Sequence, residues 1–343
     1  MTSKPPLHLV LAHHTCIAGQ PIRGAVALNF RSVRDDPLDE VRVDLRGIMH
    51  ISYSRRHGCG KEVILLVYES KSLWKRGERY PPAGTRFLRI PFNLELPADV
   101  PPSCYVSSGG TVVRIDYKVE AIGVRSSMLR LHEKVDCSFK VVTSDAVGAP
   151  LRAKLKGGWQ GPWATKTARR RIRKGLWGAH ADVQLEFTYP AIPVLPLSSA
   201  IPFALSIATV SRPLPRTYDR RIWPSPPFKP HEVKLTLRQS VHVKSRTFDR
   251  TYILPLSSLW GSVDIERFPD EWYPIDDLGV KGRWKQESVF TSVFRLRCPS
   301  AFRFSRLGHE VEIQYLVHIR VKFDRFHKMS TTIPINVASG MSI

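Results

Sequence analysis

The sequence predicts an all-β fold made of two antiparallel, immunoglobulin-like β-sandwich domains in tandem, joined by a basic connector. Three features indicate this: long segments in which apolar and polar residues alternate, turn-forming residues at their ends, and basic residues gathered mid-chain. Alternation is clearest in Val41–Leu45, Val113–Ala121 and Val311–Val321. Successive side chains of a strand point to opposite faces, so this pattern describes sheets with one buried face and one wet face.

Shorter segments with the same two-residue period occupy much of the remaining chain. They are Ile90–Leu96, Val135–Val141, Val183–Tyr189, Ile201–Ile207, Val233–Val243 and Ile333–Val337. Each is bounded by Gly, Pro, Asn, Asp or Ser, and few segments have helical periodicity. Many short strands separated by turn residues favour antiparallel sandwiches.

The length of the chain indicates two domains, because 343 residues exceed what one sandwich core usually accommodates. A weak internal repeat agrees with this. The alternating segment around Tyr117 is followed, after a loop, by Cys137–Val141, and the segment around Tyr315 is followed by Ile333–Val337. The expected parts are an N-terminal domain at 1–145, a basic connector at 146–181 and a C-terminal domain at 182–343.

The net charge of +22 is concentrated in the connector. Residues 146–181 contain nine Lys and Arg and no Asp or Glu, whereas the two domains carry +6 and +7. We expect a mobile or locally ordered linker here, flanked by Trp159, Trp163 and Trp177, whose rings suit the headgroup level of a membrane. Arginine binds phosphate oxygens in bidentate fashion. The candidate phosphate- or lipid-binding residues are Lys166, Arg169, Arg170, Arg171, Arg173 and Lys174. A solvated linker without a ligand is the alternative.

The order of the strand segments resembles the arrestins, specifically the fungal arrestin-related proteins. In the first domain the resemblance depends on Phe87–Pro102, with its proline-rich corner, and on the Tyr-bearing segment Gly110–Ile122. In the second it depends on Ala181–Thr209, Val233–Val243 and Val311–Phe323. The resemblance covers nearly the whole chain, and it implies two arrestin-like domains.

The resemblance also implies a non-catalytic adaptor. Fungal arrestin-related proteins bring a HECT-type ubiquitin ligase to membrane-protein cargo, such as a transporter or receptor, which is then internalised by endocytosis. They normally recruit the ligase through a Pro-Pro-x-Tyr motif in a C-terminal tail. This sequence contains no such motif, and we expect no tail after its last strand. We therefore expect any ligase to be bound indirectly, in ubiquitin-linked trafficking or signalling.

Other functional classes receive less support. A nucleic-acid-binding protein that uses the same basic residues is the main alternative, although aromatic residues are not interleaved with them as in base-stacking platforms. A sandwich glycosidase is a third possibility, because carboxylates can be brought together by the fold. No nucleophile elbow, Walker loop, dinucleotide fingerprint or H-E-x-x-H motif occurs, so we expect neither an enzyme nor a cofactor.

Cysteine usage and hydropathy predict a cytoplasmic protein, and the arrestin resemblance together with the basic connector implies peripheral association with the plasma membrane or endosomes. The chain has no secretory signal at its N-terminus and no apolar run of the ~20 residues that a spanning helix needs. Five scattered cysteines form no C-x-x-C pair, which indicates reduced thiols rather than a disulfide framework. They are Cys16, Cys59, Cys104, Cys137 and Cys298.

Three smaller features have ordinary structural explanations. Trp223–Pro230 contains two overlapping P-x-x-P spacings, which suit a polyproline ligand but more often form a rigid loop. The His and Cys groups lack the four spaced ligands of a zinc site, so we expect no metal. They are His13, His14 and Cys16, and His57 and Cys59. The pair Asp276-Asp277 is explained by a turn.

Overall fold

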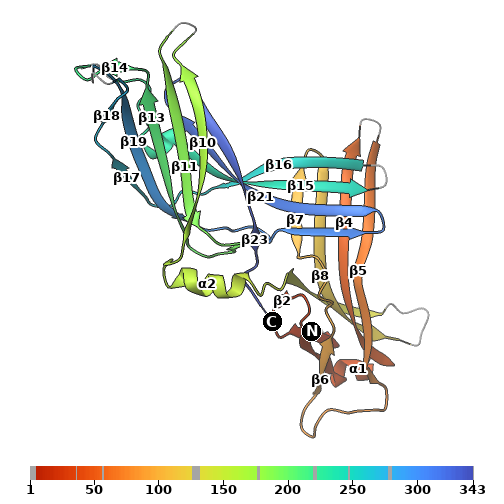
Figure 1. Cartoon of the computed structure of the whole chain (residues 1–343). Helices are drawn as coiled ribbons and strands as arrows, with labels where there is room; N and C mark the ends of the chain where they lie inside the picture. Colours follow the sequence, from red (N-terminus) through yellow and green to blue (C-terminus); the bar gives the residue numbers. More distant parts are fainter. Residues whose placement is uncertain are drawn as a thin grey trace. The chain divides into compact units, whose positions relative to one another are not determined.

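A computed structural model shows a nearly all-β chain (Figure 1). It describes residues 5–35, 37–55, 58–125, 132–175, 178–218, 222–245, 248–276 and 280–342. The chain divides into two compact units. Unit 1 comprises Met1–Ala146 and Met341–Ile343, and unit 2 comprises Val147–Gly340. Within the described ranges, no helix is both long and apolar enough to cross a membrane.

Unit 1 contains nine strands and one short helix in its described part. They are β1 (Leu7–Leu11), β2 (Thr15–Ile17), β3 (Ile22–Asn29), α1 (Phe30–Asp35), β4 (Glu40–Arg55), β5 (Gly58–Lys75), β6 (Phe87–Leu94), β7 (Cys104–Ser108), β8 (Thr111–Val124) and β9 (Glu133–Val142). One sheet has the order β1-β3-β6. The other has the order β2-β9-β8-β4-β5, with β7 also paired to β8. Every pairing is antiparallel except that of β2 with β9.

The core of unit 1 follows from the alternation in its strands. Val113, Ile115 and Tyr117 of β8 are buried, while the residues between them are more exposed. The two sheets approach closely where β8 has a glycine. A Cβ atom added at Gly123 would lie 3.2 Å from Cδ1 of Leu7 on β1. Unit 1 is therefore a sandwich-like pair of sheets with its apolar faces turned inward.

Unit 2 contains fourteen strands, one α-helix and one 3-10 helix in its described part. They are α2 (Gly148–Lys156), β10 (Trp163–Arg173), β11 (His180–Pro190), β12 (Leu195–Pro196), β13 (Ile201–Ser211), β14 (Leu214–Pro215), η1 (Pro230–Glu232), β15 (Val233–Ser245), β16 (Phe248–Ser258), β17 (Val263–Arg267), β18 (Glu271–Pro274), β19 (Lys281–Phe294), β20 (Phe302–Arg306), β21 (His309–Lys322), β22 (Lys328–Ile335) and β23 (Val337–Ala338).

Two larger sheets and one two-stranded parallel pair, β12-β23, build unit 2. The first sheet has the order β10-β11-β13-β19-β14, with β17 and β18 also paired to β19. The second has the order β16-β15-β21-β20, with β22 also paired to β21. Trp260, after β16, joins them: its ring lies 5.7 Å from Phe203 of the first sheet, and its indole N–H donates to the Val233 carbonyl of the second. Unit 2 is thus also sandwich-like.

The two units repeat one topology. The order β1-β3-β6 corresponds to β11-β13-β19, and β5-β4-β8-β9 corresponds to β16-β15-β21-β22. In each unit a short strand also makes a parallel pair, β2 with β9 and β12 with β23. Gly19 and Ser198 follow these strands, both with positive φ, and each donates its backbone N–H to a leucine carbonyl at 3.0 Å. These matching details support the internal repeat that the sequence suggested.

The structure of residues 146–181 differs from the linker that the sequence predicted. This segment is not a linker, because it contains the helix α2 and the eleven-residue strand β10. Strand β10 pairs with β11 along its whole length, from Trp163 opposite Pro190 to Arg173 opposite His180. The compact units therefore meet in sequence at Ala146/Val147, and the basic segment belongs to unit 2.

Candidate functional site

The basic residues predicted from the sequence lie on β10 and in the turn that follows it. Strand β10 is an edge of its sheet, since β11 is its neighbour on one side only. Along β10, Ile172 is buried and Ala168 is half-buried, so these residues mark the face turned to the core. All six predicted basic residues are exposed. The structure thus brings them together on one ordered element instead of a mobile chain.

The strand sorts the basic side chains between its two faces. Arg169, Arg171 and Arg173 share the face opposite Ile172, because residues two apart point the same way. Their Cα atoms are about 6.6 Å apart at a rise of about 3.3 Å per residue. Lys166 and Arg170 lie on the face of Ile172 yet stay exposed, as expected at an edge. Three guanidinium groups consequently form a row on the outer face.

An acidic residue of the neighbouring strand holds one member of this row. Arg171 Nε lies 2.8 Å from Oδ1 of Asp182, which is its cross-strand partner. Arg283 Nη1 lies 3.5 Å from Oδ2 of the same carboxylate. The hydrogen bond from Arg171 lowers the pKa of Asp182, so this carboxylate stays ionised and keeps Arg171 in place. Arg171 is therefore the fixed centre of the row.

The other basic residues of the strand keep their charges available. Within the described ranges, no ion pair involves Lys166, Arg169, Arg170 or Lys174. The guanidinium group of Arg173 makes a long contact, with Nε 3.4 Å from the Gly178 carbonyl oxygen. Trp163, at the start of the strand, is 47% exposed and shares the outer face with the arginine row. The arrangement can present several unpaired cations and one exposed aromatic ring to an anionic ligand.

A histidine anchors the C-terminal end of β10. Nε2 of His327 lies 2.8 Å from the backbone oxygen of Arg173, and Nδ1 lies 2.8 Å from the Asp324 carboxylate. Both ring nitrogens therefore face oxygen acceptors. Partial burial opposes ionisation of Asp324, but hydrogen bonds from the N–H groups of Phe326 and His327, from the His327 ring and from the Trp223 indole lower its pKa to about 2. This cluster fixes the strand end that carries Arg173.

The proline-rich segment is a built-in loop of unit 2. Pro224, Pro226 and Pro227 are buried, and the Ser288 hydroxyl donates to the Pro227 carbonyl at 2.7 Å. The Glu232 carboxylate accepts the next two backbone N–H groups. Buried prolines do not present a polyproline ligand to an aromatic groove. The structure therefore supports the rigid-loop interpretation.

Two residues of the smaller groups noted in the sequence, Cys16 and Asp276, have ordinary structural surroundings. Cys16 is buried, which raises the pKa of its thiol, and its sulfur contacts the carbonyl of His13. Asp276 accepts the backbone N–H groups of two residues later in its loop, as a turn residue does. Three residues noted in the sequence lie outside the described ranges: His57, Trp177 and Asp277.

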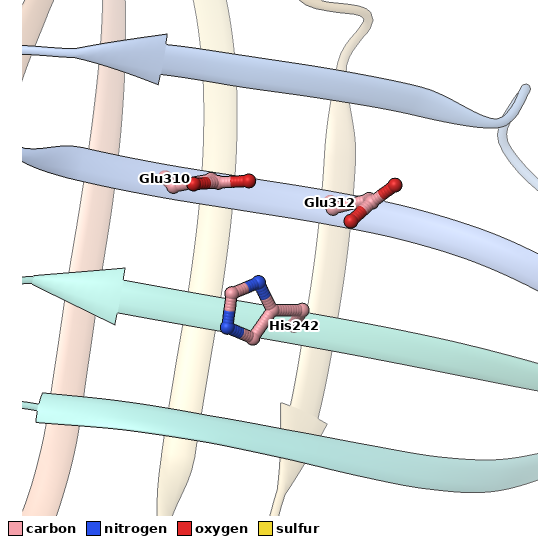
Figure 2. A group of neighbouring side chains, drawn as sticks. All are labelled: His242, Glu310 and Glu312. Atoms are coloured by element: carbon pink, nitrogen blue, oxygen red, sulfur yellow. The ribbon is translucent and has the colours of Figure 1, made fainter.

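One cluster was missed by the sequence analysis. His242 of β15 and Glu310 and Glu312 of β21 are half-buried, and one donor atom from each lies within 4.8 Å of the others (Figure 2). The spacing Glu-x-Glu within one alternating strand was the available signal, because it places both carboxylates on one face. His242 lies 68 residues before Glu310 in the sequence, and only the strand register brings it close to the two glutamates.

Comparisons with known proteins add no family assignment. No protein-family model matches the chain, and no curated protein matches it in sequence. Conclusions about function therefore depend on the geometry of these sites.

Proposed function

We propose that the chain is a non-catalytic adaptor in which the exposed basic residues of β10 bind phosphate groups. The observation that supports this most directly is the exposure of Arg169, Arg170 and Arg173 on an ordered edge strand, without an ion-pair partner among the described residues. Guanidinium groups make bidentate, charge-assisted hydrogen bonds to phosphate oxygens. A β-strand fixes the spacing of these groups, so less conformational entropy is lost on binding than from a linker.

The phosphate chemistry is shared by an anionic lipid headgroup and a phosphorylated protein tail. Near an anionic membrane each basic side chain contributes about 1 kcal/mol, and screening by salt reduces this contribution. The exposed ring of Trp163 on the same face suits the interface between headgroups and acyl chains. Five cations without an ion-pair partner in the described part of the chain thus favour salt-sensitive binding to membranes that contain phosphoinositides.

The adaptor part of the proposal is supported by the arrestin resemblance together with the two sandwich-like units of repeated topology. In this view the chain works in the cytoplasm and associates peripherally with the plasma membrane or endosomes. It binds membrane-protein cargo and contributes to endocytosis, protein transport or signalling. Any ubiquitin ligase reaches the complex through another protein, since the chain contains no Pro-Pro-x-Tyr motif.

Vesicle co-sedimentation tests the phosphate site. We expect the full chain to sediment with vesicles of phosphatidylcholine plus phosphoinositide, but not with phosphatidylcholine alone. The variant Arg169→Ala/Arg170→Ala/Arg173→Ala should lose most of this binding. A matched control removes three exposed arginines of unit 2 outside β10, Arg295, Arg297 and Arg325. Equal losses in both triple variants would show attraction by net charge alone and contradict a site on β10.

Two further measurements separate the sources of phosphate and the alternative function. Soluble inositol phosphate should compete with vesicles for the chain, whereas uncharged inositol should not. A gel shift with single-stranded RNA and duplex DNA tests the nucleic-acid alternative, which uses the same basic residues. Binding of nucleic acid that is tighter than vesicle binding at equal salt, and that is lost in the β10 variant, would replace the adaptor proposal.

A further inference from the structure

Three potential metal ligands meet on the outer face of the β16-β15-β21-β20 sheet of unit 2. His242 lies directly opposite Glu312 in the register of β15 and β21, and Glu310 is two residues away on the same face (Figure 2). One nitrogen and two carboxylate oxygens lie within 4.8 Å of one another. Ligand atoms on a tetrahedral zinc ion with bonds of about 2.1 Å lie about 3.4 Å apart. The half-buried carboxylates would therefore have to rotate inward to enclose an ion.

The imidazole ring is oriented for this purpose by a carboxylate behind it. Oδ1 of Asp249, on β16, lies 2.9 Å from Nε2 of His242. A carboxylate only accepts, so in the neutral ring Nε2 carries the proton and Nδ1 has a free lone pair. Figure 2 shows one ring nitrogen directed towards β21 and the other directed away from it. A histidine that donates to a carboxylate through one nitrogen and binds the ion through the other is the usual arrangement in metal centres.

Each glutamate is held by a hydrogen bond or an ion pair to one of its two oxygens. Gln314 Nε2 donates to Oε1 of Glu312 at 2.8 Å. Arg303 Nε lies 2.8 Å from Oε1 of Glu310. In metal centres the carboxylate ligands are themselves hydrogen-bonded in this way, which fixes their direction. The same contacts are expected in the competing interpretation, in which the cluster is an ion-pair network without a metal.

We propose that His242, Glu310 and Glu312 bind a divalent transition metal, with zinc as the expected ion. One imidazole with two carboxylates suits zinc, whereas calcium and magnesium prefer oxygen ligands alone. Three protein ligands leave a fourth position for water or for a group of a partner. The ion would connect β15 to β21, and Asp249 would extend the connection to β16.

Zinc titration of the untagged full chain tests the proposal. Isothermal titration with ZnCl₂, backed by metal analysis after equilibrium dialysis, should show one more bound ion per wild-type chain than per His242→Ala chain. The matched control is His318→Ala. His318 shares this sheet face, but its ring contacts the Thr332 hydroxyl and not a carboxylate. That variant should bind as many ions as the wild type.

Two more variants keep the test decisive if His242→Ala fails to fold. Glu310→Gln/Glu312→Gln removes both carboxylates and should abolish the same ion. Asp249→Asn removes only the orienting carboxylate and should weaken zinc binding about 10- to 100-fold. The proposal is overturned if the wild type binds no zinc, if calcium or magnesium binds there more tightly, or if the double glutamine variant retains wild-type affinity.

Discussion

Removing the hydroxyl of Tyr117 should destabilise unit 1 and leave unit 2 unchanged. Tyr117 is 1% exposed on β8, and its hydroxyl donates to the Pro101 carbonyl at 2.6 Å. In Tyr117→Phe that carbonyl loses its partner inside the core. Leaving a buried polar group unpaired costs about 1–3 kcal/mol. A loss of about 1–3 kcal/mol raises the equilibrium constant for opening of unit 1 about 5- to 150-fold. We therefore expect the slowest-exchanging amides of β4 and β8 to exchange faster by the same factor.

Hydrogen exchange with peptide-level mass spectrometry measures this directly, because it resolves the two units in one chain. Tyr315→Phe is the matched variant in unit 2, where the Tyr315 hydroxyl accepts from the Gln239 amide at 3.1 Å. Each variant should accelerate exchange in its own unit. Unchanged protection of β8 in Tyr117→Phe would refute the assignment of a stabilising role to this hydrogen bond. Equal acceleration in both units would refute their independence.

Two other predictions concern pH and thiol chemistry. The pKa of Asp324 falls from 3.8 to about 2 in the folded chain, so its carboxylate stabilises the fold above about pH 4, and this contribution is lost as the pH falls through 2. Asp324→Asn should therefore lower the free energy of unfolding at pH 7 by about 1 kcal/mol, a value reduced for solvent screening, and the difference from wild type should shrink towards pH 2 in urea titrations. Burial raises the pKa of the Cys104 thiol to about 12, whereas Cys59 is exposed. Iodoacetamide at pH 8 should consequently alkylate Cys59 and leave Cys104 unmodified in the native chain, as peptide mapping would show.

Alternation predicted the strands that have one buried and one wet face. It located β4, β8 and β21 because their apolar residues occupy every second position. It missed β10, where Lys166 and Arg170 stand on the face of Ile172 and break the apolar row. An edge strand tolerates this, because long side chains there reach water from either face. It also missed β5, whose run Val63–Val67 is apolar at every position and so carries no period of two.

The candidate sites also differ in how far the sequence could predict them. The basic residues of β10 are contiguous in sequence, so composition alone was enough to find them. Whether they formed a linker or a strand depended on pairing with β11, which is a tertiary property. The cluster of His242, Glu310 and Glu312 depends on register as well, since a shift of one residue would turn His242 to the other face. Side chains brought together by register are not visible in a single sequence.

The charges of β10 have a second physical explanation, which is protection of a sheet edge. Exposed edge strands invite pairing with other chains, and Lys or Arg on the edge prevents it. The edge strand β5 argues against this as the whole explanation, because it exposes Val63 and Leu65 at 58% and 53%. If this protein needed five cations to protect an edge, β5 would need them also.

Charge reversal separates protection of the edge from ligand binding. Arg169→Glu/Arg173→Glu keeps the edge strongly charged but repels phosphate. If the charges only protect the edge, this variant should be a monomer as soluble as the wild type. Its binding to vesicles should then fall only as much as the change in net charge requires. A phosphate site predicts loss of binding to phosphoinositide vesicles far beyond that of the control Arg295→Glu/Arg297→Glu, which makes the same change in net charge. Light scattering and vesicle sedimentation on the same preparations measure both quantities, and equal binding by the two variants would leave edge protection as the role of β10.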